Sequence, residues 1–129
     1  MLSLKGVHHI AIICSNYEKS KHFYTQILGF TINQEIYRQE RDSYKLDLSL
    51  NGHYTIELFS FPSPAPRPSR PEAMGLRHLA FSVDDISVAK LQLESSGIEC
   101  EDIRTDESTN KKFFFFKDPD DLPLELYEN

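Results

Sequence analysis

Residues 7–12 read Val-His-His-Ile-Ala-Ile, and residues 76–81 read Leu-Arg-His-Leu-Ala-Phe. The second segment repeats the first, with His78 lying 69 positions after His9. Each histidine is followed by a glutamate between apolar residues: Glu57 lies 48 positions after His9, and Glu125 lies 47 after His78. Self-similarity of this kind indicates two copies of one supersecondary unit. The sequence therefore predicts two matching halves that each contribute one imidazole and one carboxylate.

Each histidine segment is predicted to be a strand that leads into a helix. Asn16 and Asp85 both lie seven positions after their histidines, and both residue types favour the start of a helix. Residues 44–50 then alternate between apolar and polar side chains, and Asn51-Gly52 supplies turn chemistry before residues 54–59. This pattern predicts a β-hairpin in the first half.

The second half contains two later segments that match this hairpin. Residues 112–117 include four consecutive phenylalanines, and residues 122–127 follow after an Asp-Pro-Asp-Asp turn. Each half therefore reads βαβββ, which predicts an α+β fold class. We expect a single domain over residues 1–129, made of one module at 5–60 and a second at 75–128. The linker at 61–74 contains five prolines and cannot be a central strand or a helix.

The register of the hairpin decides which sheet face Glu57 occupies. A two-residue loop would place Glu57 on the face of the alternating leucines. A three-residue loop through His53 would instead place it with Lys45 and Asp47. We favour the second register because it separates an apolar face from a polar one.

Composition narrows the range of partners. The chain has 14 basic and 20 acidic residues and a net charge of −6, which repels phosphate backbones and anionic membranes. We therefore expect neither nucleic acid nor a membrane as partner. The segment at the N-terminus lacks the apolar core of a secretory signal, so a cytoplasmic location is expected.

The two cysteines, Cys14 and Cys100, are too few for a disulfide framework and are predicted to be free thiols.

His9, Glu57, His78 and Glu125 together form a candidate metal site. Two imidazoles and two carboxylates suit one divalent transition metal per site (Ni, Zn, Co, Mn or Fe) better than Ca or Mg. A single strand histidine is more often structural, and strand alternation can equally turn a glutamate towards water. The repeated spacing is the reason to prefer the metal site over these alternatives.

At these residues the chain resembles the vicinal oxygen chelate superfamily, which comprises glyoxalases, bleomycin resistance proteins and dioxygenases. It is most similar to the small bacterial glyoxalase I-like members of the YaeR type. The resemblance extends over the whole chain and is carried by several segments: His9-Ile-Ala-Ile, Phe23-Tyr24, Leu28-Gly29-Phe30, Ile56-Glu57-Leu58, Arg77 to Asp85, and Asp118-Pro119-Asp120 before Leu124-Glu125-Leu126. It implies two βαβββ modules that form a cupped mixed sheet, with His9, Glu57, His78 and Glu125 at the four metal positions.

The resemblance also implies a function. The expected activity is that of a metal-dependent lyase or isomerase, similar to lactoylglutathione lyase, acting on a small substrate with vicinal oxygens through a metal-stabilised enediolate. Glu125 is expected to be the mobile catalytic base, and Glu57 a ligand or second proton carrier, with exchange of these roles left open. The resemblance further implies a homodimer, in which the site forms either within one chain or across two.

The chain departs from glyoxalase I where that family binds glutathione. Glyoxalase I binds glutathione with an arginine and an asparagine, and the corresponding positions of this chain are Ile13 and Phe61. Two apolar side chains cannot bind a peptide carboxylate. The sequence therefore does not identify the substrate or decide whether a thiol takes part. One alternative is another metal enzyme of the superfamily, such as a thiol transferase or an epimerase. The other is a non-catalytic protein that binds a small molecule.

Overall fold

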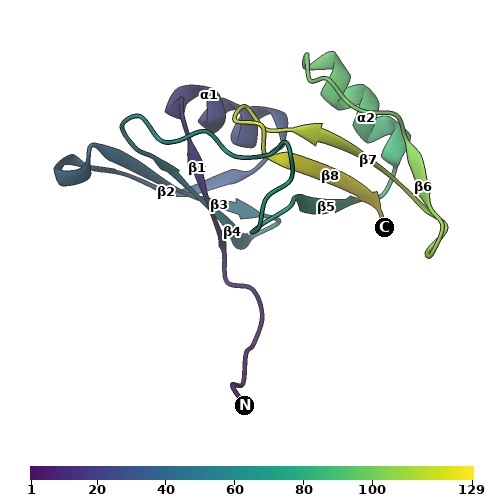
Figure 1. The fold of residues 1–129 in the computed structure, drawn as a ribbon, viewed down its shortest axis with the longest axis horizontal. Coiled ribbons are helices and arrows are strands. Elements are labelled where there is room, and N and C mark those ends of the chain that lie inside the picture. The colour runs from purple at the N-terminus through teal and green to yellow at the C-terminus, as the bar shows by residue number, and fades with distance from the viewer. The chain divides into compact units, whose positions relative to one another are not determined.

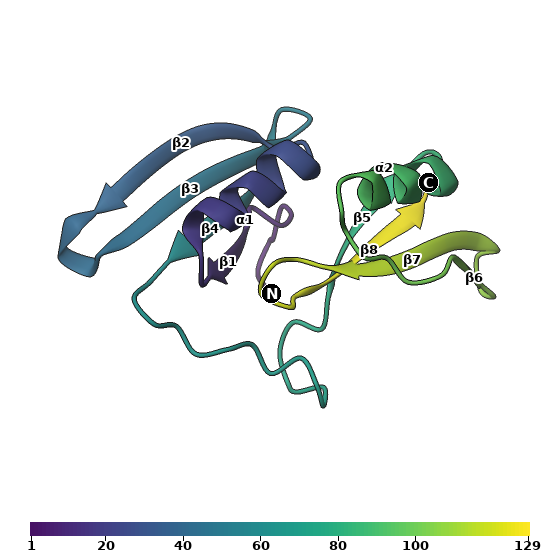
Figure 2. The same ribbon diagram turned by 90° about the horizontal axis from the view of Figure 1, so that it is seen from above.

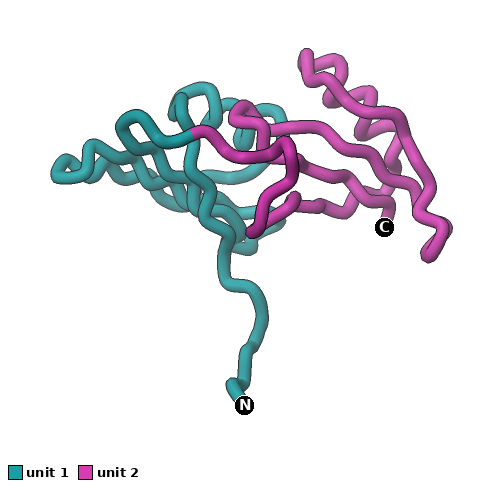
Figure 3. The backbone as a smooth tube through the Cα atoms, in the orientation of Figure 1, with its two compact units in different colours: residues 1–65 teal, residues 66–129 magenta.

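The structure is a computed structural model that describes residues 1–129. The chain divides into two compact units, Met1–Ala65 and Pro66–Asn129, shown in teal and magenta in Figure 3. The division falls inside the proline-rich linker. The linker forms neither a strand nor a helix, as expected.

The first unit has the predicted βαβββ order, and its strands form one four-stranded sheet (Figure 1). The sheet order is β1-β4-β3-β2, with β1 parallel to β4 and the other pairs antiparallel. The elements are β1 (Ile10–Cys14), α1 (Tyr17–His22), the π-helical turn η1 (Phe23–Ile27), β2 (Thr31–Arg38), the 3₁₀ turn η2 (Gln39–Arg41), β3 (Ser43–Leu50) and β4 (His53–Ser60).

The second unit repeats this topology. Its sheet order is β5-β8-β7-β6, again with the first and last strands parallel. The elements are β5 (Leu79–Val83), α2 (Ile86–Ser95), β6 (Arg104–Asp106), β7 (Lys111–Lys117) and β8 (Pro123–Glu128). The prediction of two βαβββ modules is confirmed, with one sheet in each module.

Both helices begin where the sequence predicts. The side chains of Asn16 and Asp85 accept hydrogen bonds from the backbone N–H three residues later, at 3.1 and 3.0 Å. These contacts satisfy one of the donors that every helix leaves unpaired at its first turn. None of the helices has both the length and the apolar composition needed to span a lipid bilayer.

Each unit buries one face of its sheet beneath its helix, as Figure 2 shows. With the exception of Tyr54 in β4, the even-numbered positions of the paired strands point into this core, because successive side chains of a strand alternate between faces. The buried strand residues are Leu46, Leu48, Ile56 and Leu58 in the first unit, and Phe114, Phe116, Leu124 and Leu126 in the second. The opposite face of each sheet stays open and carries the odd-numbered residues, including both glutamates.

The turn between β3 and β4 has two residues, so the expected three-residue loop through His53 is wrong. Leu50 pairs directly with His53 across the turn. Asn51 and Gly52 have φ angles of 51° and 79°. A two-residue turn with both φ angles positive is of the type that matches the twist of a hairpin.

Glu57 nevertheless lies on the predicted polar face, because the hairpin contains a β-bulge. The register shifts by one residue between Leu48 and Ser49, and Thr55 is the extra residue of β4. Beyond the bulge Glu57 pairs with Asp47. The bulge thus restores the separation of apolar and polar faces that a two-residue turn alone would lose.

Glu35 joins β2 to the helix α1. Its carboxylate accepts a hydrogen bond from Lys21 Nζ at 2.7 Å and another from the hydroxyl of Tyr17. The hydrogen bond from Lys21, and then that from Tyr17, lowers the pKa of the Glu35 carboxyl. Burial, together with the neighbouring carboxylate, raises the pKa of Tyr17, so its hydroxyl stays a donor at neutral pH.

The core of the first unit should depend strongly on Leu48. Leu48→Ala removes a side chain with no exposed surface and should lower the free energy of unfolding by about 2–5 kcal/mol. Leu91→Ala is the matched control, because Leu91 is 67% exposed and its truncation should change stability by less than about 0.5 kcal/mol. Urea unfolding followed by circular dichroism measures both. Equal effects of the two substitutions would contradict the assignment of the core.

The contribution of Glu35 to the free energy of unfolding should depend on pH. Its folded pKa is lowered, so the stabilisation is present above the unfolded value of about 4.3 and is lost as the pH falls through the folded value. Both Glu35 and Lys21 are partly exposed, so Glu35→Gln should cost about 1 kcal/mol or less at pH 7. Urea unfolding at several pH values measures the difference in the free energy of unfolding between Glu35→Gln and the unsubstituted protein. This difference should shrink towards pH 3. The exposed control Glu40→Gln should show no such trend. A difference that grows on acidification would show that Glu35 is not held as a carboxylate.

Candidate functional site

The first half-site lies on the open face of the first sheet. His9 immediately precedes β1, and Ala11, two residues later, pairs with Glu57 of the parallel strand β4. Residues two apart on a strand share a face, as do partners on neighbouring strands. His9 Nε2 accordingly lies 3.6 Å from Glu57 Oε1. The structure brings these two predicted ligands together.

The second carboxylate oxygen of Glu57 is held by other side chains. The hydroxyl of Tyr54 donates to Glu57 Oε2 at 3.1 Å, and Lys45 Nζ lies 3.5 Å from the same oxygen. Asp47 accepts from Tyr54 at 3.1 Å and from Lys45 at 3.0 Å, which fixes both donors in turn. Glu57 is thus oriented with Oε2 in this network and Oε1 towards His9.

The protonation states of the two donors follow from their surroundings. Burial, then the hydrogen bond to Glu57 and the charge of Asp47, raises the pKa of the Tyr54 phenol above its usual range. The hydrogen bond to Asp47 raises the pKa of the Lys45 ammonium. At neutral pH Tyr54 is therefore a neutral donor and Lys45 a cation.

Tyr54 is a site residue that reasoning from the sequence missed. In a regular strand, positions 54 and 57 would lie on opposite faces, because they are three residues apart. The bulge at Thr55 brings both side chains to the same face. The sequence did hold a signal, because its Asn-Gly turn and its polar pattern require different registers, and a bulge satisfies both.

The rings of Tyr54 and His8 border His9. Tyr54 stacks on His9 with a centroid distance of 5.3 Å, and His8 Nδ1 lies 2.8 Å from His9 Nδ1. Strict alternation along a strand would place His8 and His9 on opposite faces. The strand begins only at Ile10, so alternation does not hold the side chain of His8 on the face opposite His9.

The second half-site lies at the equivalent place in the second unit. His78 immediately precedes β5, and Ala80 pairs with Glu125 of the parallel strand β8. The neighbours on the other side differ from those of the first unit, because Glu125 lies opposite Phe115 of β7. The Phe115 ring meets the His78 ring edge-on, with centroids 5.0 Å apart. An aromatic surface thus replaces the polar network around Glu57.

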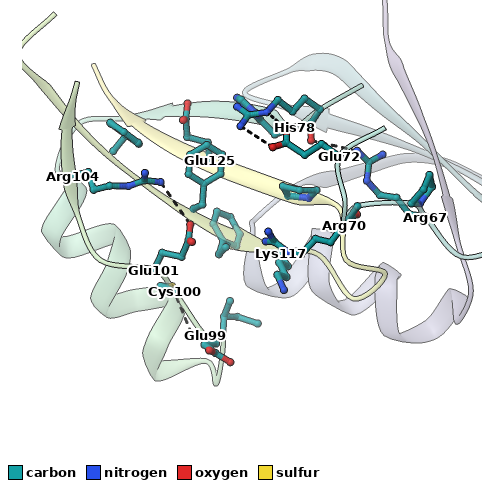
Figure 4. A pocket seen from close by; sticks show the side chains of 18 of the residues that line it. Arg67, Arg70, Glu72, His78, Glu99, Cys100, Glu101, Arg104, Lys117 and Glu125 are labelled. Carbon is teal, nitrogen blue, oxygen red and sulfur yellow. Dashed lines mark hydrogen bonds and ion pairs between the residues drawn. The ribbon is translucent and has the colours of Figure 1, made fainter. Parts of the chain in front are cut away.

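His78 and Glu125 both line a cavity of about 780 Å³ within the second unit (Figure 4). A volume of this size is typical of small-molecule sites. The walls come from the linker end of the unit, the segment after α2, and the strands β7 and β8. The charged and aromatic lining residues are Arg67, Arg70, Glu72, Arg77, His78, Glu99, Glu101, Arg104, Phe113, Phe115, Phe116, Lys117 and Glu125.

Neither unit alone holds a complete metal site. Within neither unit do three or more His, Cys, Asp or Glu side chains gather so as to hold a metal ion. Each unit has one histidine and one glutamate at equivalent positions, and their role as metal ligands stays a prediction. Of the two residues at the glutathione-binding positions of glyoxalase I, Ile13 is 54% exposed. Phe61 stacks on Phe59 and lies beneath the guanidinium of Arg41, whose centre is 5.0 Å from the ring.

Comparison with known proteins agrees with this architecture. Residues 6–126 match the model of the Glyoxalase/Bleomycin resistance protein/Dioxygenase superfamily. The chain is 66% identical to protein YaeR of Escherichia coli (strain K12) over 128 residues, which cover 99% of each chain. It is also 66% identical to protein YwkD of Bacillus subtilis (strain 168) over 125 residues, 97% of this chain and 98% of YwkD.

A solved structure extends the likeness to three dimensions. The glyoxalase family protein from Enterococcus faecalis is 48% identical and superimposes with a TM-score of 0.88, over 96% of this chain and 98% of its own. The paired βαβββ units, the equivalent half-sites and these matches agree. The chain belongs to the glyoxalase/bleomycin resistance protein/dioxygenase superfamily.

Proposed function

We propose that this protein is a divalent-metal-dependent lyase or isomerase of glyoxalase type, acting on a small substrate with two neighbouring oxygens. The observation that carries the proposal is the equivalence of the half-sites. In each unit a histidine immediately precedes the first strand. The alanine two residues after this histidine pairs with a glutamate of the last strand. Members of this superfamily often use a divalent metal, and the fosfomycin resistance protein FosX of Listeria monocytogenes was solved with Mn(II).

The donor atoms fit a transition metal. Histidine nitrogens and carboxylate oxygens bind such ions at about 2.0–2.2 Å, so two donors on one ion lie roughly 3–4 Å apart. His9 Nε2 and Glu57 Oε1 are separated by 3.6 Å, which suits two ligands of a common ion. His9, Glu57, His78 and Glu125 would hold a single Ni, Zn, Co, Mn or Fe ion.

Joining the two halves of the ligand set is part of the proposal. A first unit and a second unit could share one metal ion in two ways. The two units could come from the same chain, or from different chains of a homodimer. We favour a homodimer as the assembled form. Either pairing supplies two imidazoles and two carboxylates to each site.

The surroundings of the two glutamates support different roles for them. Glu57 is restrained through Oε2 by Tyr54 and Lys45, so it serves as a fixed ligand. Glu125 lies between Ala80 and Phe115 on the neighbouring strands, and these side chains have no hydrogen-bond donor to restrain it. Glu125 is therefore the carboxylate that can move and carry a proton.

The proposed reaction is a proton transfer within the substrate. A bound divalent cation would act as a Lewis acid on the two neighbouring oxygens. The Glu125 carboxylate takes the proton from the carbon that bears the hydroxyl and the thioether of a hemithioacetal. Glu125 then returns this proton to the adjacent carbonyl carbon, and the hydroxyl proton passes to the former carbonyl oxygen, so the product is a 2-hydroxy thioester. No atom is gained or lost.

Removing the Tyr54 hydroxyl should weaken metal binding. Tyr54→Phe keeps the ring on His9 but frees Glu57 Oε2, and loss of a group that orients a ligand typically lowers metal affinity by about 10–100-fold. Isothermal titration of metal-free protein with Co²⁺ measures the change. Tyr37→Phe is the matched control, because its hydroxyl binds Asp42 instead. Equal affinities in both variants and the unsubstituted protein would show that Tyr54 does not position Glu57.

Replacing Glu125 should abolish turnover while the metal stays bound. Glu125→Gln retains an oxygen ligand but cannot accept the proton, so kcat should fall by about 10²–10⁴-fold. The assay follows hemithioacetals of methylglyoxal with several thiols, and elemental analysis gives the metal content. Glu107→Gln, at an exposed position, is the control.

Three outcomes would contradict the proposed function. Turnover by Glu125→Gln at the unsubstituted rate would mean that the base is another group. Absence of stoichiometric metal under every loading condition would exclude the metal centre. Stoichiometric metal and tight ligand binding, without turnover of any hemithioacetal, would indicate a binding protein instead.

A further inference from the structure

The cavity beside His78 and Glu125 has a basic end that the proposed reaction does not use. Arg67 and Arg70 come from the linker, and Lys117 comes from the end of β7. Figure 4 shows these three side chains together on one side of the cavity. Glu101 and Arg104 lie on the other side.

The charge of the cavity contrasts with that of the whole chain. The chain has a net charge of −6. The cavity lining, however, contains five basic residues against four acidic ones (Arg67, Arg70, Arg77, Arg104 and Lys117 against Glu72, Glu99, Glu101 and Glu125). The excess of one positive charge in an acidic protein favours a ligand with a single negative charge.

Two of the acidic lining residues, Glu72 and Glu101, are paired with cations of the same cavity. Glu72 forms an ion pair with Arg77, and Glu101 lies 3.8 Å from Arg104. The Arg104 guanidinium also stacks over Phe113, with its centre 5.0 Å from the ring. These ion pairs engage Arg77 and Arg104 with acidic residues of the lining, whereas Arg67, Arg70 and Lys117 form no ion pair with a lining carboxylate.

The three remaining cations differ in how they are held. The guanidinium of Arg67 is fixed by hydrogen bonds to the backbone oxygens of Leu76 and Arg77, while its buried Nε has no partner. Lys117 forms an ion pair with Asp121 at 3.1 Å, with both side chains about half exposed. Such surface pairs contribute little free energy, so Lys117 can exchange this partner for a ligand. Arg70 is exposed at the same end.

We propose that Arg67, Arg70 and Lys117 form a subsite for a carboxylate of the substrate. The inference rests on the proposed function, because it places the two neighbouring oxygens of the substrate at His78 and Glu125. The carboxylate then lies at the far end of the same molecule. A planar guanidinium matches a carboxylate with two parallel hydrogen bonds, and an ammonium adds a point charge. The subsite would select an acidic substrate without the residues that glyoxalase I uses for glutathione.

Hydroxamates provide matched probes, because the hydroxamate group binds a metal through two neighbouring oxygens. Succinic, glutaric and adipic monohydroxamates carry a carboxylate at increasing distance, and alkyl hydroxamates of the same chain lengths carry none. Binding of each to Co²⁺-loaded protein is measured by isothermal titration. At the best chain length the carboxylate should tighten binding by about tenfold or more, as expected for a hydrogen bond to a charged group.

A double variant locates the effect. Arg70→Gln with Lys117→Gln should remove the advantage of the carboxylate and leave the alkyl hydroxamates unchanged. Lys19→Gln with Lys112→Gln changes the net charge equally at exposed positions outside the cavity, and it should retain the advantage.

The outcomes separate the two proposals. Equal binding of carboxylate and alkyl hydroxamates by the unsubstituted protein would overturn the subsite and leave the metal centre standing. Equal loss of the advantage in both double variants would also overturn it, because the effect would then be one of overall charge. Failure of every hydroxamate to bind the loaded protein would overturn the binding of two neighbouring oxygens at the metal, and the subsite with it.

Discussion

The parallel pairing of the first and last strands in each module is the constraint on which the candidate site depends. It places Ala11 beside Glu57 and Ala80 beside Glu125. Partners on parallel strands share a sheet face, so each glutamate faces the same side as the histidine two residues before its alanine. A shift by one residue would turn the glutamate into the apolar core. The leucines and isoleucines on either side of each glutamate oppose such a shift, because they would have to leave that core.

The two modules share this geometry but not the chemistry around it. In the first module Glu57 faces Asp47 and contacts Tyr54 and Lys45, so its carboxylate is held on one side by donors. In the second module Glu125 faces Phe115. A carboxylate among donors is restrained, whereas one beside an aromatic ring is free to change its position. Repetition thus provides two equivalent pairs of a histidine and a glutamate, and the proposed roles of fixed ligand and mobile base rest on the divergence of the neighbouring strand.

The linker has a role beyond connection. Its prolines exclude it from both sheets, yet its second part belongs to the second unit and provides Arg67 and Arg70 to the wall of the cavity. An irregular segment can approach a sheet face without competing for backbone hydrogen bonds with the strands. The linker therefore contributes charged side chains to the cavity that His78, next to β5, and Glu125, in β8, also line.

The sequence by itself determined the module order, both helix starts and the pairing of a histidine with a glutamate in each half. These are local features: periodicity selects helix or strand, Asn16 and Asp85 satisfy the first donors of a helix, and repeated spacing fixes equivalent positions. Only the tertiary structure decided the features that depend on register and on contacts between distant segments. The bulge at Thr55 brings Tyr54 to Glu57, and the linker arginines come to lie beside the cavity. Neither can be read from the order of residues, because a strand pattern does not specify where an extra residue is inserted, and an irregular segment carries no periodicity that predicts its path.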